Sequence, residues 1–380
     1  MRPLLSHGLH RNELNPEMPP RVASDAKQLA DEVSGGERGV IKGPLRGYHH
    51  ETYVLRLDGG TQIVKVREPR AEILWFDRRC FESEEQLLRT LQGKVERIPE
   101  VLDVAGMGFQ GFIEGRTLPT RRWAGRRVSD PVFDQIVELF RQMAEIRSDL
   151  LESVPRRCLQ RDRADDRDTD GFLERLIVFI EDQVYEKNLA EFGDLFGQLG
   201  VGGESFVRLK KKMSGLRRRP FGLLHADLHR KNFVVDSRGR LWTIDWELAM
   251  LGDPLYDLAT HLYLMRYPED QQRRMAAEWS RVVEKGNPGG SYGLADDLDV
   301  LLDFKRAQSV FTDVIRVSLA LGDGTGFNWA ALPWAARKLH RVLTAAAGPL
   351  ELAEVPSHPE IMAALMRRRR PADPGHPPSS

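Results

Sequence analysis

The chain has 380 residues and a mass of 43.3 kDa, 41% of its residues are hydrophobic, and 56 basic residues balance 56 acidic ones. The charge balance excludes a basic nucleic-acid coat, and the apolar content excludes an acidic disordered chain. No apolar run approaches the roughly 18 residues that span a membrane, and the N-terminus lacks an apolar signal segment. We therefore predict a cytoplasmic protein that binds neither nucleic acid nor membrane.

Cysteine and lysine are both scarce. Cys80 and Cys158 lie far apart in the sequence and have no Cys or His neighbour at metal-ligand spacing. We expect two reduced, packed thiols instead of a disulfide framework. Only 12 of the 56 basic residues are lysines, so a lysine at a special position is informative.

In chain order, a short N-terminal extension precedes a strand-rich part and then a helix-rich part. Two strands, Tyr53–Leu57 and Thr61–Val66, are predicted around an Asp-Gly-Gly turn. A helical pattern from Ile73 to Leu91 ends at Gly93. Two further strands are expected at Ile98–Val104 and Gly111–Gly115. The later predicted helices are Val132–Ile146, Phe172–Leu189, Phe206–Leu216, Leu298–Leu321 and Leu332–Leu343.

Two polar clusters, each bracketed by apolar residues, stand in the helix-rich part. A predicted hairpin, Phe233–Val235 with Leu241–Ile244, would fold them together. Asp227, Asn232 and Asp245 would then share one small volume. Their hard oxygen atoms suit Mg²⁺, which takes few protein ligands and shares its other positions with water and phosphate.

These residues also carry a family resemblance. His225-x-Asp227-x₄-Asn232, followed by Ile244-Asp245-Trp246-Glu247, resembles the aminoglycoside phosphotransferase and choline kinase family. His229 and the segment Gly252–Ala259 continue the resemblance, which covers about 35 residues of linked motifs.

The resemblance implies an α+β, bilobal protein-kinase-like fold with a small antiparallel-sheet N-lobe and a large helical C-lobe. The implied parts are an N-terminal extension (1–35), a nucleotide-binding N-lobe (36–113), a helical catalytic and substrate C-lobe (114–354) and a Pro/Arg-rich tail (355–380), disordered at its end.

Roles for the polar residues follow from the resemblance. Asp227 would accept or orient the proton of a substrate hydroxyl, and Asn232 and Asp245 would hold Mg²⁺ against the ATP phosphates. A capping role for Asp227 alone would leave Asn232 and Asp245 unexplained. His225, His229 and Asp257 would be structural residues near the site.

ATP would be held by the N-terminal part. Lys65, in the second predicted strand, would grip the phosphates while paired with a glutamate. Glu84 is the preferred partner, with Glu85 and Glu82 as rivals. No GxGxxG stands in residues 43–52, so Gly47 and the backbone of 49–52 are the phosphate-loop candidates. Residues 109–113 would connect the lobes, and the adenine contacts are expected at Gln110, Phe112 and Ile113.

The predicted function is an ATP- and Mg²⁺-dependent O-phosphotransferase that phosphorylates a hydroxyl group of a small molecule, such as an aminoglycoside or another antibiotic-like alcohol. One alternative is a kinase for Ser or Thr of a peptide in natural-product maturation. Another is a non-catalytic pseudokinase that binds a partner. The sequence leaves the oligomeric state open. For the basic run Arg217–Arg219 and the acidic run Asp296–Asp303 we favour charged, solvated surfaces.

Overall fold

The computed structural model describes residues 40–46, 50–56, 63–69, 78–104, 107–120, 126–322 and 326–368. The chain divides into two compact units, Met1–Ala71 and Glu72–Ser380. It is a mixed α/β protein with small antiparallel sheets and a helical majority, as predicted. The bounds of the four parts expected from the sequence stay predictions.

The described residues of the first unit form three antiparallel strands. They are β1 (Val40–Arg46), β2 (His50–Arg56) and β3 (Ile63–Pro69). Lys65 lies on β3, opposite Val54 of β2, so the predicted strand position of this lysine is confirmed. The side chain of Lys65, the turn at 58–60 and Gly47 lie outside the described residues.

The second unit begins with a shorter helix than the sequence predicted. Helix α2 (Glu84–Leu91) starts at Ser83, whose hydroxyl accepts the backbone N–H of Gln86, and two acidic residues follow in its first turn. The expected start at Ile73 is wrong for the described residues 78–83, because Phe81 instead forms a β-bridge with Arg156.

A hairpin replaces one of the predicted strands. Strands β4 (Val101–Val104) and β5 (Met107–Gly111) pair with each other in antiparallel register. The predicted strand at Gly111–Gly115 is therefore wrong, since Gly111 is the last residue of β5 and residues 112–114 have no regular structure. The two-residue strand β6 (Arg116–Thr117) follows.

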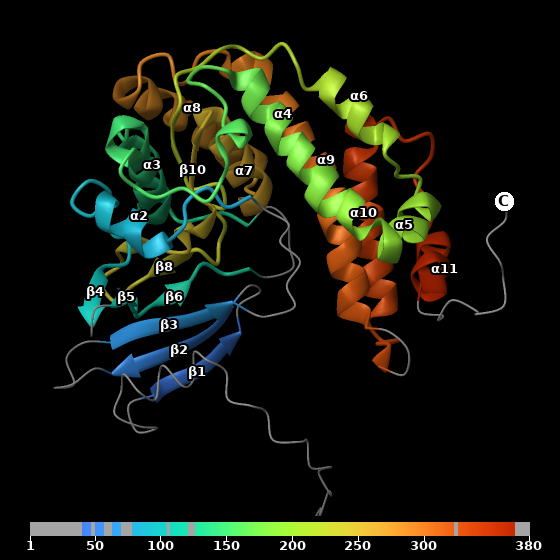
Figure 1. Cartoon of the computed structure of the whole chain (residues 1–380), viewed down its shortest axis with the longest axis horizontal. Helices are drawn as coiled ribbons and strands as arrows, with labels where there is room; N and C mark the ends of the chain where they lie inside the picture. The colour runs from blue at the N-terminus through green and yellow to red at the C-terminus, as the bar shows by residue number, and fades with distance from the viewer. Residues whose placement is uncertain are drawn as a thin grey trace, which may run out of the picture. The chain divides into compact units, whose positions relative to one another are not determined.

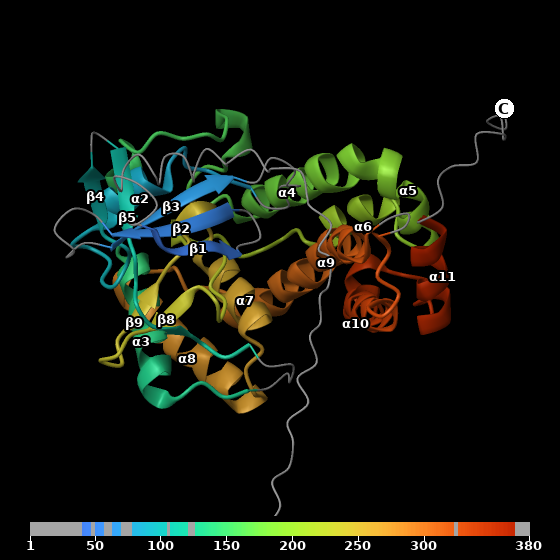
Figure 2. The same ribbon diagram turned by 90° about the horizontal axis from the view of Figure 1, so that it is seen from below.

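Helices dominate the rest of this unit (Figures 1 and 2). They are α3 (Asp130–Ala144), α4 (Thr169–Phe179), α5 (Leu189–Gln198), α6 (Glu204–Lys212), α7 (Pro254–Met265), α8 (Glu269–Gly286), α9 (Leu294–Leu321), α10 (Leu332–Leu350) and α11 (His358–Arg368). The long α9 packs along α10, α11 packs against α10 and α5, and α3 packs against α8. Helix α11 lies in the first part of the predicted Pro/Arg-rich tail, whereas residues 369–380, where disorder is predicted, are outside the described residues.

Four short strands frame the polar clusters. They are β7 (Gly222–Leu224), β8 (Phe233–Val235), β9 (Leu241–Thr243) and β10 (Met250–Gly252). Strands β8 and β9 form the predicted hairpin, with Val234 opposite Trp242. Strand β10 returns to pair with β7, with Leu251 opposite Leu223. The polar loops between these strands are thus anchored at both ends on a buried apolar frame.

No described helix is long and apolar enough to cross a membrane.

Candidate active site

Asp257 of α7 supports the loop 225–232 between β7 and β8. One carboxylate oxygen of Asp257 accepts the N–H of His225 at 3.1 Å, and the other accepts the N–H of Ala226 at 2.8 Å. Ala226 has a positive φ of 64°, which costs an alanine about 1 kcal/mol or more. Burial raises the pKa of Asp257 to about 6, while the two N–H groups lower it. The strained turn therefore depends on a buried carboxylate.

His225 bridges the two polar clusters as a neutral ring. Its Nδ1 accepts the N–H of Asp227 at 3.3 Å, so the proton is on Nε2, which donates to the carbonyl of Ile244 at 3.2 Å. The ring is fully buried and lies against the indole of Trp246, and this burial lowers its pKa to about 4. The histidine thus fixes the loop and carries no charge near neutral pH.

Asn232 holds the carboxylate of Asp227, and His229 lies beside it. The amide nitrogen of Asn232 donates to the backbone carbonyl of Asp227 at 2.9 Å and to Oδ2 of its carboxylate at 3.1 Å. Nε2 of His229 lies 3.6 Å from the same oxygen, and burial lowers the pKa of this histidine. The side chain of Asp227 is still 28% exposed, so it can meet a substrate.

Asp245 comes directly after Ile244, whose backbone contacts the first polar cluster. The N–H of Ile244 donates to the carbonyl of Asn232 at 2.9 Å, which brings the second cluster beside the first as predicted. Asp245 has the left-handed conformation, with φ of 71° and ψ of 60°. The N–H of the next residue, Trp246, donates to a carboxylate oxygen of Glu84 at 2.8 Å. Helix α2 therefore contacts the Asp245 turn directly.

The residues proposed to hold Mg²⁺ have suitable chemistry. Because the nitrogen of the Asn232 amide donates to Asp227, its oxygen is the atom that can ligate a cation. Together with the Asp245 carboxylate it supplies hard oxygen donors, the small protein set that Mg²⁺ accepts. Among the described residues, no group of three or more His, Cys, Asp and Glu side chains forms a metal cluster. The metal roles of Asn232 and Asp245 stay predictions.

The predicted nucleotide residues are only partly brought together in the described structure. Glu85 accepts a hydrogen bond from the amide of Gln110 at 2.8 Å, whereas Glu84 contacts Trp246. The glutamate that pairs with Lys65 is left open by these contacts. Phe112 and Ile113 follow β5 as an irregular segment, and their adenine contacts stay predictions.

The arginines near this site, and the proximity of the two cysteines to each other, were not predicted from the sequence. Arg79 forms an ion pair with Glu247 at 2.5 Å, two residues after Asp245. Cys80 and Cys158 are free and buried, as expected, but they are hydrogen-bonded to each other, which their distance in sequence concealed. Because arginine is abundant throughout the chain, the pair Arg78-Arg79 did not stand out in the sequence.

The fold and the braced Asp227 loop define the class of a kinase-like phosphotransferase. The structure of the choline kinase LicA from Streptococcus pneumoniae is similar, with a TM-score of 0.50 and 16% identity over 85% of this chain and 98% of that chain. The macrolide 2'-phosphotransferase MphH from Brachybacterium faecium gives a TM-score of 0.49 and 15% identity over 87% of this chain and 99% of that chain. Comparison with curated proteins gives no match.

Family membership is shown by sequence. The model of the phosphotransferase enzyme family matches residues 40–291, so the chain belongs to this family. The predicted family resemblance is thereby confirmed, and the chain is a phosphotransferase.

Proposed function

We propose that the chain transfers the γ-phosphoryl group of ATP to a hydroxyl group of a small molecule. The substrate oxygen forms a bond to the γ-phosphorus, the bond from that phosphorus to the β,γ-bridging oxygen breaks, and ADP leaves. The proton of the hydroxyl passes to Asp227 and from there to solvent. The cytoplasmic location predicted from the sequence stays a prediction.

The observation that carries this proposal is the hold of Asn232 on Asp227. Its amide nitrogen fixes one oxygen, Oδ2, of a partly exposed carboxylate by a 3.1 Å hydrogen bond. His229 lies beside the same oxygen. A base must be within hydrogen-bond reach of the proton it takes, and a carboxylate fixed in this way is pre-oriented for that task.

Asn232 and Asp245 would hold Mg²⁺, which when bound neutralises charge on the phosphates. Lys65 would meet the phosphates from β3, and Gln110, Phe112 and Ile113 would border the adenine. These assignments rest on the family pattern and on the contacts described above.

The test mixes the purified full-length protein with ATP, Mg²⁺ and a panel of alcohols that includes aminoglycosides, choline-like alcohols and sugars. We expect release of ADP with at least one acceptor, an added phosphoryl group on that acceptor by mass spectrometry, and loss of both on adding EDTA. ATP binding without turnover on any acceptor, or an added phosphoryl group on a peptide alone, would contradict the small-molecule proposal.

A further inference from the structure

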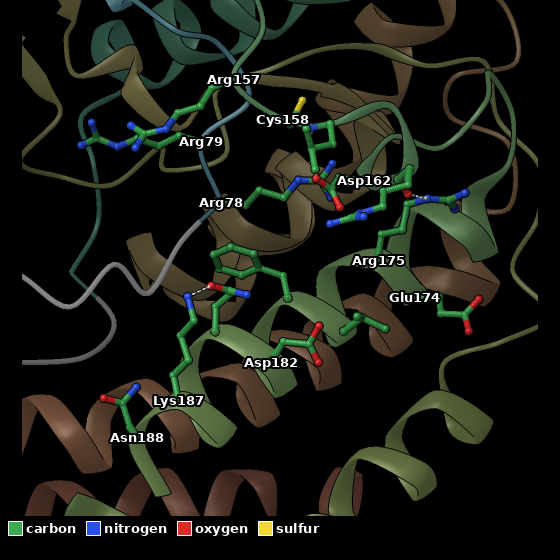
Figure 3. Close-up of a pocket in the computed structure, with 15 residues that line it drawn as sticks. Arg78, Arg79, Arg157, Cys158, Asp162, Glu174, Arg175, Asp182, Lys187 and Asn188 are labelled. Carbon is green, nitrogen blue, oxygen red and sulfur yellow. Dashed lines mark hydrogen bonds between the residues drawn. The ribbon is translucent and has the colours of Figure 1, made fainter. Parts of the chain in front are cut away.

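A large cavity lies beside the candidate active site, within the second compact unit (Figure 3). Its volume is about 1090 Å³, and its wall comes from residues 78–79, from the segment 157–162 and from α4 with the turns that follow it. This volume slightly exceeds the roughly 300–1,000 Å³ that is usual for small-molecule sites, so the cavity is large enough for an acceptor substrate.

The lining is dominated by positive charge. Among the described residues of the lining, three carboxylates, Asp162, Glu174 and Asp182, face twice as many basic side chains. The basic residues are Arg78, Arg79, Arg157, Arg161, Arg175 and Lys187. In a chain with no net charge, such a concentration of one sign on one cavity focuses the field on anions.

The cavity lies near the candidate reacting groups, although Asp227, Asn232 and Asp245 are not among the residues that line it. Arg78 and Phe179 line a second, smaller cavity whose wall includes Ala226, the residue before Asp227. On the other side, Arg79 is paired with Glu247 of the Asp245 turn. Figure 3 shows Arg79 and Arg157 extending together to one side, while Arg78 extends toward Asp162.

One of the lining arginines, Arg175, is held in place by backbone carbonyls before any ligand binds. Nε of Arg175 donates to the carbonyl of Arg161 at 3.2 Å, and its Nη1 donates to the carbonyl of Gly171 at 2.8 Å. Nε of Arg78 is buried and has no hydrogen-bond partner among the described residues. Because this nitrogen is closed to solvent, it cannot itself meet a ligand, and an anion would contact the outer guanidinium nitrogens of the arginines that line the cavity.

From these observations we infer that the acceptor alcohol carries an anionic group, a phosphate or a carboxylate, which the arginines of this cavity bind. The inference rests on the proposed function and narrows its substrate class. Guanidinium groups bind both oxyanions through paired, charge-assisted hydrogen bonds, whereas an amino sugar or a choline-like alcohol would face like charge.

The experiment measures binding without turnover. Full-length protein is saturated with Mg²⁺ and a non-hydrolysable ATP analogue, which occupies the nucleotide site, and is titrated calorimetrically with glucose 6-phosphate, glucuronate and glucosamine. We expect at least one anionic sugar to bind more tightly than glucosamine by a factor of about ten or more. The anionic sugar that binds then distinguishes phosphate from carboxylate.

The matched variants remove charge inside and outside the cavity. In Arg157→Gln with Arg161→Gln, two exposed lining residues, anion binding should weaken about tenfold or more. The control Arg281→Gln removes an exposed arginine of α8 and should leave the affinity for the anion unchanged. The inference would be overturned if glucosamine bound at least as tightly as both anions. It would also be overturned if anion binding survived the double change, or if neither anion bound at all.

Failure of this inference and failure of the proposed function give different results. Phosphorylation of neutral or cationic alcohols that is insensitive to the double change would overturn the inference and leave the proposed function standing. Anion binding that depends on these arginines, without phosphoryl transfer to any alcohol, would leave the inference standing and contradict the proposed function.

Discussion

The histidines around the candidate base are neutral hydrogen-bonding groups. His225 and His229 each accept backbone N–H groups at Nδ1, and burial lowers the pKa of both rings. A third ring, His261 of α7, contacts the carbonyl of Leu228 at 3.0 Å and the hydroxyl of Tyr267 at 2.9 Å. The loop is therefore supported by polar side chains that must not gain a proton.

His261 gives a pH prediction. Burial lowers the pKa of His261 from 6.5 to about 3. Between these two pH values the histidine is protonated in the unfolded chain and neutral in the folded chain. Stability from this group is complete above pH 6.5 and is lost as the pH falls. Between about pH 7 and about pH 5, the free energy of unfolding of the wild type should fall by about 2 kcal/mol more than that of His261→Gln. Urea unfolding at both pH values measures this difference. Equal losses in the two proteins would contradict this assignment.

At the scale of elements, one buried arginine joins three segments. Arg219, which precedes β7, is fully buried and binds both oxygens of Asp253, at 2.8 and 2.7 Å. It also binds Asp297 of α9 at 2.5 Å. Asp253 in turn caps α7 by accepting the N–H of Leu255. The predicted solvated surface is thus wrong at Arg219 and at Asp297, because both are buried in this network.

Arg219→Met should lower the free energy of unfolding by about 3–5 kcal/mol, because it leaves two carboxylates buried without their cation. Its neighbour Arg218 is exposed, so Arg218→Met is the matched control and should change stability by less than about 0.5 kcal/mol. Denaturant unfolding measures both. Similar losses for the two variants would show that the buried network does not support the fold.

The parts of the fold that could be predicted are those with local signals. The β8–β9 hairpin and the position of Lys65 follow from alternation and turn residues, and most helices follow from apolar periodicity. The start of α2 could not be predicted, because Phe81 keeps the helical spacing while its backbone pairs with Arg156. The Arg219 network and the arginine-lined cavity depend on residues distant in sequence, and no local pattern encodes such contacts.

For the whole molecule, zero net charge conceals a strong separation of charge. Carboxylates gather at Asp227, Asp245 and Glu247, while arginines line the adjoining cavity. The family match ends at residue 291, and the described helices α9, α10 and α11 follow it. These helices extend the core of the second unit, and α9 supplies Asp297 to the Arg219 network.

The central claim is that Asp227 serves phosphoryl transfer from ATP to an alcohol. The most direct measurement is the rate of transfer of the γ-phosphoryl group to the accepted alcohol by the wild type and by Asp227→Asn, with Asp299→Asn on the exposed face of α9 as the control. We predict a fall in kcat of about 10²- to 10⁴-fold for Asp227→Asn, unchanged ATP affinity, and full activity for the control. Undiminished transfer by Asp227→Asn would contradict the account.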